Sequence, residues 1–348
     1  MKILQVTPRY APRTGGVETH VRELATRLVK AGHSVTVVTA DRRSDDPRNQ
    51  TIDGVDVVRH RGVAPGGAFH VAPGVAATVQ TSAADIVHAH NYHSLPLLFA
   101  AAAVGSDQRF VATPHYHGGS ADRVRDVLLD LYRYPGGWAL RRADAVIAVS
   151  DWERDRLARD LDVDARTIPN GIDRDRFADA TPETRDRPYL LCVGRLEEYK
   201  GIQHVIRGLD RLPEYDLVVA GSGPYRDQLE RIAERVGVAD RVHFEGFVAD
   251  DRLPSLYAGA SVYVSLSAFE AFGMTVQEAI AAGTPCVVRE AGALAEWAYR
   301  DGVASITSDE HDAVAAGIRS VRCESTDPST VNDWNDVVSK IECVYSRS

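Results

Sequence analysis

Short apolar runs alternate with longer amphipathic segments through most of the chain. An apolar run of about four to eight residues favours a buried strand, and apolar residues at helical spacing favour a helix that covers a sheet. In the first half the pattern predicts strands at 2–7, 34–39, 55–59, 85–88, 109–112 and 144–148, with helices at 17–31, 73–82, 94–104, 121–142 and 151–161. This alternation indicates an α/β fold built on a parallel sheet.

The same alternation starts again after a polar, proline-bearing stretch at 169–188, which we interpret as a linker. It predicts strands at 189–193, 216–220, 241–244, 261–265 and 285–288, and helices at 202–211, 224–236, 275–282 and 310–321. We therefore expect two Rossmann-like domains, at 1–168 and 189–328, facing each other across a cleft. A last amphipathic helix, within 329–348, is expected to pack back on the first domain. Open parallel sheets bind ligands beyond the carboxyl ends of their strands.

Composition excludes several classes of function. The chain has 348 residues, 44% hydrophobic and 26% charged, and its net charge of −9 disfavours a nucleic-acid-binding protein. An acidic protein with only four lysines fits either salt adaptation or the codon bias of a GC-rich genome. No apolar run approaches the roughly 18 residues of a membrane span, and the first residues predict a strand rather than a secretory signal. Four scattered cysteines indicate no disulfide framework, so we expect a cytoplasmic protein.

Glycines lie at the first predicted strand-to-helix turn. Gly15 and Gly16 allow close approach of the backbone, and the free amide groups of the helix that follows favour an anion. A tight turn explains the same two residues without any ligand. The spacing is not the dinucleotide-binding fingerprint, because no further glycine follows at the required position.

Candidate phosphate ligands lie in the second half. Arg195 and Lys200 follow a predicted buried strand, where two cations are suited to hold a diphosphate. Glu270 and Glu278 flank a glycine turn and a helix start. The backbone amides of Gly273, Met274 and Thr275 are expected to point at a phosphate, and Glu278 to accept hydrogen bonds from both ribose hydroxyls.

Together the motifs resemble the retaining GT-B glycosyltransferases of family 4, the group that includes phosphatidylinositol mannosyltransferases and sucrose synthases. The resemblance covers nearly the whole chain: Gly15-Gly16, Ile147-Ala148-Val149-Ser150, Ile168-Pro169-Asn170-Gly171-Ile172-Asp173, Gly194-Arg195 with Lys200-Gly201, Ala220-Gly221-Ser222-Gly223-Pro224 and the Glu270…Glu278 pair. One departure is that Ala293 stands where the family usually has the second glycine of a Gly-Gly turn.

The resemblance implies a role for each matching residue. Arg195 and Lys200 would bind the donor pyrophosphate, Glu278 the ribose, and Glu270 the hydroxyls of the transferred sugar. His115 would be the catalytic histidine near that sugar. The remaining donor-binding residues would be Gly15 and Gly16, Phe247 and Val248 at the base, and Phe272, Gly273, Met274 and Thr275 at the phosphate.

The implied function is retaining transfer of a hexose from a UDP- or GDP-sugar to a lipid-linked, saccharide or other hydroxyl acceptor, without a metal ion or other cofactor. Two alternatives stay open. One is a nucleotide-sugar epimerase of the same two-domain shape, which the Glu270…Glu278 pattern disfavours. The other is a non-catalytic nucleotide-sugar-binding protein, which would keep the phosphate ligands and lack His115.

Histidines end two of the predicted strands: His88, His90 and His93 end one, and His115 and His117 end another. Alternate residues of a strand share a face, so His88 and His90 together with His115 and His117 are candidates for a metal site. No cysteine or nearby carboxylate completes that set. We favour one functional histidine, His115, with the others as hydrogen-bonding groups.

The segment 122–142 mixes basic and aromatic residues on an amphipathic pattern. Such a helix suits peripheral contact with the anionic cytoplasmic face of a membrane, or a lipid-linked acceptor. The alternative is a helix that packs on the first domain with its arginines reaching to water. The residues concerned are Arg123, Arg125, Arg133, Arg141, Arg142, Leu128, Leu129, Tyr132, Tyr134 and Trp138.

Overall fold

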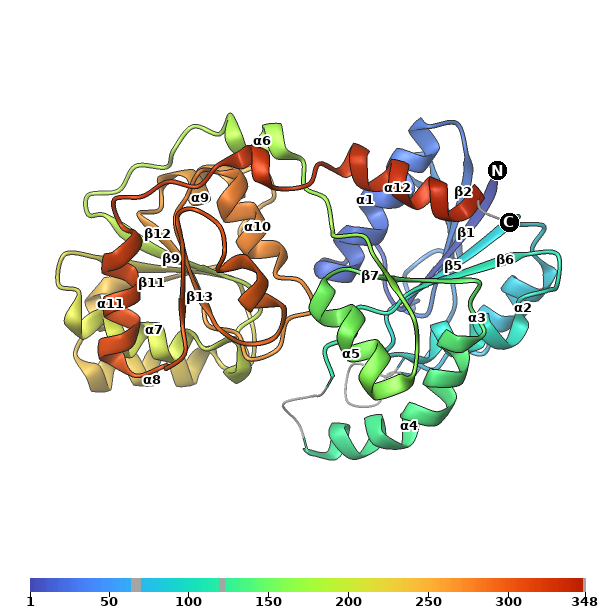
Figure 1. Ribbon diagram of the computed structural model, residues 1–348, viewed down its shortest axis with the longest axis horizontal. Coiled ribbons are helices and arrows are strands. Elements are labelled where there is room, and N and C mark those ends of the chain that lie inside the picture. The colour runs from blue at the N-terminus through green and yellow to red at the C-terminus, as the bar shows by residue number, and fades with distance from the viewer. Residues whose placement is uncertain (64–69, 119–122, 347–348) are drawn as a thin grey trace. The chain divides into compact units, whose positions relative to one another are not determined.

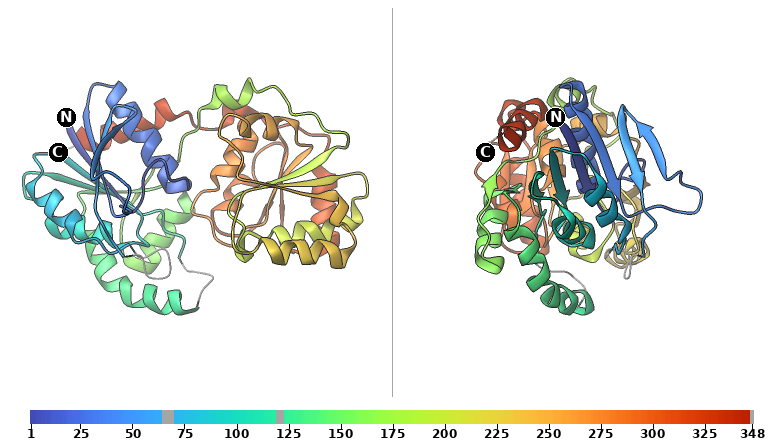
Figure 2. Two further views of the ribbon diagram at one scale, coloured as in Figure 1. Left: turned by 180° about the vertical axis from the view of Figure 1, so that it is seen from behind. Right: turned by 90° about the vertical axis from the view of Figure 1, so that its right-hand side faces the viewer.

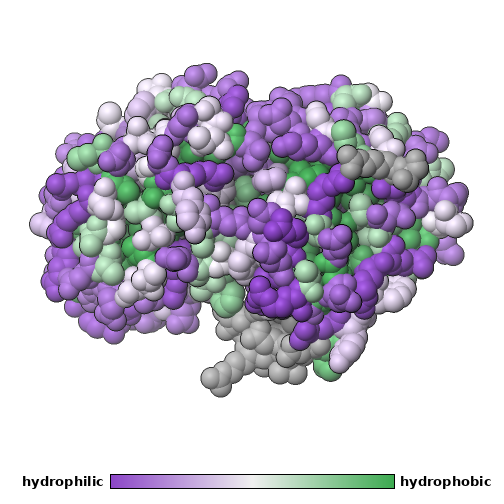
Figure 3. Space-filling model, in the orientation of Figure 1, coloured by the Kyte–Doolittle hydropathy of each residue, from purple (hydrophilic) through white to green (hydrophobic). Residues whose placement is uncertain are grey.

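The computed structural model describes residues 1–63, 70–118 and 123–346 (Figure 1). For residues 123–130 it describes the backbone only. The chain divides into two compact units. Unit 1 consists of Met1–Asn170 and Trp334–Ser348, and unit 2 of Gly171–Asp333. On the face shown in Figure 3, polar residues cover most of each unit and apolar residues surface only in small groups.

Unit 1 is built on an eight-stranded sheet with the order β3-β4-β2-β1-β5-β6-β7-β8. All neighbours pair in parallel except β3 and β4. Strand β2 lies on one side of β1, and β5 lies on the other side. The strand order therefore reverses between β1 and β5. The strands are β1 (Lys2–Thr7), β2 (Ser34–Thr39), β3 (Asn49–Ile52), β4 (Val55–Arg59), β5 (Ile86–His90), β6 (Arg109–Thr113), β7 (Ala145–Ala148) and β8 (Arg166–Thr167).

Helices cover both faces of this sheet because successive strand residues point to opposite sides. Ile3 belongs to a core cluster with α1 (Gly16–Lys30) and α12 (Trp334–Ser346), which lie side by side in Figures 1 and 2. Its neighbour Leu4 belongs to a second cluster on the other face. The helices of that face are α2 (Gly74–Thr81), α3 (Leu95–Ala103), α4 (Arg123–Arg141) and α5 (Asp151–Leu161).

Unit 2 has a six-stranded, fully parallel sheet with the order β11-β10-β9-β12-β13-β14. Here the order reverses between β9 and β12. The strands are β9 (Tyr189–Val193), β10 (Asp216–Ala220), β11 (Val242–Gly246), β12 (Val262–Ser265), β13 (Cys286–Arg289) and β14 (Val303–Ile306). The helices are α6 (Arg174–Ala178), α7 (Ile202–Gly208), α8 (Arg226–Val236), α9 (Leu253–Gly259), α10 (Met274–Ala281) and α11 (His311–Val321). Two parallel Rossmann-like sheets confirm the predicted fold class.

The stretch 169–188 differs from the predicted linker. From Gly171 onward it belongs to unit 2, and it contains α6. The reason is Phe177, which is buried and packs against Tyr257 with ring centroids 5.9 Å apart. A single apolar anchor in a polar stretch gives no periodic signal, so the sequence pattern missed it.

Other differences concern short elements. The pattern did not predict β3, β8, β14 or α9, of which β8 has only two residues. The last helix begins at Trp334 rather than near residue 329, because Pro328–Thr330 form a separate 3-10 turn. The Asp327 side chain caps this turn by accepting a hydrogen bond from the Ser329 amide.

Candidate active site

The carboxyl ends of β9 and β12 lie next to each other where the strand order of unit 2 reverses. In open α/β sheets this is the position at which ligands bind, because the loops from the two strands turn to opposite faces and leave a crevice. A pocket lies here. It is lined by the ends of the two strands, the loops that follow them and the first turn of α10: Cys192, Val193, Gly194, Arg195, Lys200, Ile202, Tyr263, Val264, Ser265, Glu270 and Thr275.

Two of the residues that line this pocket form an ion pair. Lys200 Nζ lies 2.5 Å from Glu270 Oε1, and each side chain is only about one fifth exposed. Burial works against the ammonium group, but the Glu270 carboxylate outweighs this effect and raises the pKa of Lys200 above its usual value. Lys200 is therefore a fixed cation at neutral pH. Arg195 is more exposed and pairs with Glu197, with its Nε 3.1 Å from Glu197 Oε1.

The backbone joins the loops that carry these two charges. The amide of Ala268 donates to the carbonyl of Tyr199 over 2.8 Å, which connects the loop after β12 to the loop after β9. Between them, Gly201 has a φ of 75°, and a Cβ there would come within 2.3 Å of the Leu266 carbonyl oxygen. Only glycine permits this approach. Lys200 and Glu270 are thus held together by the loop backbones as well as by their charges.

The first turn of α10 begins beside Glu270. Gly273 precedes the helix with a φ of 93°, and no side chain of the described residues caps this end. The first amide groups of an α-helix have no partner within the helix, so this end favours an anion. Gly273, Met274 and Thr275 are the predicted phosphate-binding residues, and the structure places them next to the Lys200–Glu270 pair through Thr275.

The segment after β13 packs against this turn. Trp297 Nε1 donates to the Phe272 carbonyl over 2.6 Å, and the buried Phe272 ring packs edge-on against Trp297. The amide of Ala293 donates to the Glu270 carbonyl over 3.4 Å. Ala293 therefore meets the Glu270 segment through its backbone, a contact that does not depend on the side chain. The Ala293 departure from the family pattern leaves this support intact.

Glu278 lies further along α10 and does not line the pocket with Lys200. Its Oε2 accepts a hydrogen bond from the Tyr257 hydroxyl over 2.7 Å. Burial raises the pKa of Glu278 to about 7, and the Tyr257 hydrogen bond opposes this rise. Phe247 and Val248 follow β11, at the outer edge of the sheet, with Phe247 70% exposed and Val248 half-buried.

The predicted histidine, His115, lies in unit 1, beyond the carboxyl end of a strand of its parallel sheet. His115 follows β6, is buried, and has a φ of 49°. A non-glycine residue in the left-handed region is uncommon, and such conformations concentrate at functional sites. Burial lowers the pKa of His115 well below its usual value, so its ring is neutral at neutral pH.

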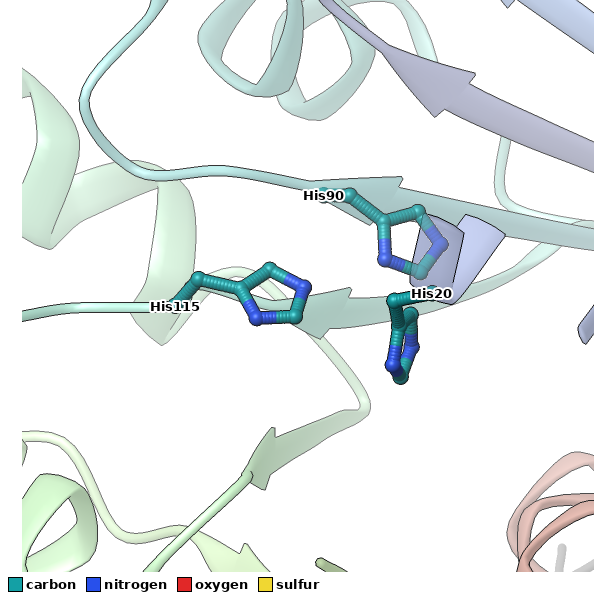
Figure 4. Close-up of side chains that lie close together, drawn as sticks. All are labelled: His20, His90 and His115. Atoms are coloured by element: carbon teal, nitrogen blue, oxygen red, sulfur yellow. The ribbon is translucent and has the colours of Figure 1, made fainter. Parts of the chain in front are cut away.

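The neighbours of His115 differ from the predicted set. Figure 4 shows its ring beside those of His90, at the end of β5, and His20, on α1. His88 hydrogen-bonds to Thr113 and Tyr345, and His117 stacks on His93 instead. The His88 ring still packs against that of His90, with centroids 4.2 Å apart, but its two nitrogens are taken by Thr113 and Tyr345. The structure therefore does not bring the four candidate histidines together as one set of metal ligands. The strand pattern missed His20 because it comes from a helix, α1, which follows β1 along the chain.

Gly15 and Gly16 lie at the start of α1, as predicted. The structure gives Gly15 a local reason: a Cβ there would come within 2.3 Å of Glu18 Oε2. Glu18 is buried and pairs with Arg9, its Oε1 lying 2.5 Å from Arg9 Nε. The carboxylate of Glu18 therefore already lies beside the start of α1.

The described part of the amphipathic segment forms α4 from Arg123 onward. Residue 122 and the side chains at 123–130 lie outside the described part. In the remainder, Leu131, Tyr134 and Trp138 are exposed. Their spacing of three and four places them along one side of the helix. A second pocket that the sequence did not predict is lined by residues of α4, α5 and the loops after β5 and β6: Tyr92, His93, Tyr116, Gly118, Arg133, Arg156 and Asp160. Among the described residues, no helix combines the length and apolar composition needed to cross a bilayer.

Comparison with known proteins places this architecture in a family. Residues 14–176 match the family model described as Glycosyltransferase Family 4, and residues 173–330 match that of Glycosyl transferases group 1. An uncharacterized glycosyltransferase of Methanocaldococcus jannaschii is 31% identical over 325 residues, which cover 85% of this chain and 82% of the relative. A GDP-mannose-dependent α-(1-6)-phosphatidylinositol monomannoside mannosyltransferase of Mycolicibacterium smegmatis is 30% identical over 330 residues, 84% of this chain and 82% of the relative.

Solved structures agree on the fold. Sucrose-phosphate synthase from Thermosynechococcus elongatus matches 99% of this chain and 98% of its own, with a TM-score of 0.83 and 20% identity. The HepE protein of Anabaena, solved in complex with UDP and glucose, matches all of both chains with a TM-score of 0.79 and 21% identity. Both family models, the relatives of 30% identity or more and the two Rossmann-like units lead to one conclusion: the chain belongs to the family 4, group 1 glycosyltransferases of the GT-B fold.

Proposed function

We propose that the protein is a retaining hexosyltransferase that uses a UDP- or GDP-linked sugar as donor and a hydroxyl group as acceptor. The observation that carries the proposal is the partly buried Lys200–Glu270 ion pair at the strand-order reversal of unit 2, with Arg195 beside it. A cation and a carboxylate in one pocket suit a ligand that combines a diphosphate with sugar hydroxyls.

In this proposal the donor pyrophosphate lies against Lys200, Arg195 and the start of α10. The developing charge of the leaving nucleoside diphosphate is then stabilised by two side-chain cations and by helix amide groups. A divalent metal ion is not needed for that purpose. Glu270 accepts hydrogen bonds from the transferred sugar, Glu278 from the ribose, and the exposed Phe247 ring with Val248 holds the base.

His115 is proposed to hydrogen-bond the transferred sugar during the reaction. Its neutral ring can donate from one nitrogen and accept at the other. We place neither Glu270 nor Glu278 as a nucleophile of the glycosidase kind. We therefore propose attack on the face from which the nucleotide leaves, with the leaving phosphate helping to take the acceptor proton, so that the anomeric configuration is retained.

The acceptor is proposed to be lipid-linked. Support comes from the exposed side of α4 formed by Leu131, Tyr134 and Trp138, with Arg142 stacked over Trp138 at 6.0 Å. Exposed aromatic and basic groups on one helix suit an anionic membrane surface. The mycobacterial relative is named for a phosphatidylinositol acceptor. Cosedimentation with anionic vesicles would be lost on changing Tyr134 and Trp138 to Ser, whereas an equal loss with Tyr299→Ser, an exposed residue of unit 2, would contradict the assignment.

The central test is transfer by the purified protein from a panel of UDP- and GDP-sugars, with excess EDTA and at fixed ionic strength. We expect the initial rate to persist in EDTA, and proton NMR of the first-formed product to show the donor's anomeric configuration. An inverted product would contradict the proposed reaction course. A rate that vanishes in EDTA and returns with Mg²⁺ or Mn²⁺ would contradict the assignment of the phosphate charges to Lys200 and Arg195.

A further inference from the structure

Three buried histidines meet where the strand order of unit 1 reverses. His90 ends β5, His115 follows β6, and His20 lies in the first turns of α1, the helix that follows β1 (Figure 4). Their exposed fractions are 2% for His20, 0% for His90 and 9% for His115. One nitrogen from each ring lies within 4.8 Å of the nitrogens of the other two.

Hydrogen bonds fix the tautomers of two of these rings. His20 Nδ1 lies 2.7 Å from Asn170 Oδ1, and His90 Nε2 lies 2.6 Å from Gln5 Oε1. Gln5 itself is oriented by its Nε2, which donates to the Tyr345 hydroxyl over 3.1 Å. An amide oxygen only accepts hydrogen bonds, so these ring nitrogens carry the hydrogen atoms. The lone pairs are left on His20 Nε2 and His90 Nδ1.

Those two nitrogens and His115 Nε2 are buried and have no hydrogen-bond partner among the described residues. A buried nitrogen without a partner is costly, and three in one place require an explanation. Burial lowers the pKa of all three rings, which keeps them neutral and able to donate their lone pairs. Metal-binding histidines characteristically donate their other ring N–H to an oxygen acceptor, as His20 and His90 do here.

We propose that His20, His90 and His115 bind one divalent transition-metal ion of the zinc class, with the fourth coordination position open. Three histidines with an open position form a known type of zinc site. Tetrahedral zinc with Zn–N bonds of about 2.0–2.1 Å needs nitrogens about 3.3 Å apart, so the rings have to close in by about 1.5 Å or less. Imidazole nitrogen favours zinc, copper and nickel over Mg²⁺ or Ca²⁺, which bind oxygen.

The three histidines belong to unit 1, whereas the proposed pyrophosphate charges belong to unit 2. Occupation of the histidine site has a consequence that rests on the proposed function. A metal ion at His115 Nε2 takes the nitrogen that would otherwise contact the transferred sugar. Zinc is therefore expected to inhibit transfer, while the metal-free enzyme stays active in EDTA. The metal ion acts here as a regulatory ligand and takes no part in the transfer.

The first test measures binding directly. EDTA-treated full-length protein is dialysed against Zn²⁺, and separately titrated with Co²⁺, whose visible absorption distinguishes tetrahedral nitrogen ligation from octahedral solvent ligation. We expect one ion per chain and a tetrahedral cobalt spectrum. His20→Gln and His90→Gln should each weaken zinc binding by about 100-fold or more, since each removes one of three ligands. His60→Gln, a half-buried histidine of unit 1 bonded to Thr78, is the matched control and should bind as the parent does.

Absence of stoichiometric zinc in the parent, or an octahedral cobalt spectrum, would overturn the proposal without reference to any variant. Unchanged binding in folded His90→Gln would overturn it as well. The second test is the transfer rate with added Zn²⁺, and recovery of the rate on chelation. Binding without inhibition would support the metal site and contradict the role given to His115, so the two proposals fail by different results.

Discussion

Lys200 and Glu270 are 70 residues apart in the sequence, yet Lys200 Nζ and Glu270 Oε1 lie 2.5 Å apart. They meet because β9 and β12 are neighbours in the sheet although β10 and β11 lie between them along the chain. Each charge is the main partner that keeps the other stable in a largely buried position. The pair therefore both shapes the pocket and supplies its charge.

Lys200→Ala is expected to lower kcat/KM by about 10- to 100-fold, the equivalent of a lost charge-assisted contact of about 1.5–3 kcal/mol. The loss should exceed that of Lys30→Ala, a control at the end of α1 in unit 1. Steady-state kinetics with one donor at several concentrations would measure both. A Lys30 variant as impaired as the Lys200 variant would show that the pocket is misassigned.

Substitution of Glu270 and substitution of Glu278 should affect the binding of different ligands. Glu278→Ala is expected to weaken the binding of nucleotide sugar and of free nucleoside diphosphate alike, by about 1–3 kcal/mol, because both ligands contain the ribose. Glu270→Ala should impair turnover of the donor and spare binding of the free nucleotide, because its proposed partner is the sugar. Calorimetric titration with both ligands decides between these roles. Equal losses for both ligands in both variants contradict the assignment.

His115→Ala is expected to reduce transfer strongly and to leave the donor contacts of unit 2 unchanged. The matched control is His204→Ala, a half-buried residue of α7 in unit 2, whose ring pairs with Asp309 at 3.3 Å. The measurements are the transfer rate and the affinity for free nucleoside diphosphate. Near-normal turnover in the His115 variant would remove this residue from the proposed reaction.

Glu153 gives a prediction about pH. Its carboxylate is fully buried and accepts the amides of Tyr116 at 2.5 Å and Val149 at 2.6 Å. Burial raises its pKa from 4.5 to about 8, although these two hydrogen bonds oppose the rise. Between those pH values the folded state holds a proton that the unfolded state releases. The free energy of unfolding contributed by this group therefore falls by about 1.4 kcal/mol per unit as pH increases.

Urea unfolding between pH 5 and pH 8 tests this sign. Glu153→Gln should remove that part of the pH dependence, because the amide does not titrate. Glu230→Gln, an exposed residue paired with Arg226 on α8, should leave the slope unchanged. A Glu153 variant with the slope of the parent would show that this carboxyl group does not keep its proton in the folded protein.

Alanine substitutions at Gly221 and Gly237 distinguish the cost of backbone strain from the cost of steric crowding in unit 2. A Cβ at Gly221 would come within 1.8 Å of the Gly194 carbonyl oxygen, whereas a Cβ at Gly237 would meet nothing within 4 Å. Both have positive φ, 141° and 78°. Gly237→Ala should cost about 1–2 kcal/mol of stability through strain alone. Gly221→Ala should cost more and also weaken nucleotide binding, because Gly194 lines the pocket.

Denaturant unfolding gives the stability of both glycine variants, and titration with nucleoside diphosphate gives their affinities. Equal stabilities would mean that the loop after β9 moves aside at no cost. In that case the close approach of Gly194 and Gly221 would not help to hold the pocket.

Much of the fold followed from the sequence alone, because a buried parallel strand and an amphipathic helix each leave a local, periodic pattern. The strand that precedes Arg195 and the helix start at Gly273 were predictable in this way. Elements that lack periodicity were not. The two residues of β8 are too few to show a period, and α6 depends on the single buried ring of Phe177.

The motifs also placed Arg195, Lys200, Glu270 and His115 each at the end of a strand, and the family could be recognised from them. Only the tertiary structure decided which of these ends meet. Strand order brought Lys200 to Glu270, and it brought His90 and His115 to the helix that carries His20. The physical reason is that strand order depends on long-range packing of whole faces, which no local stretch of sequence records.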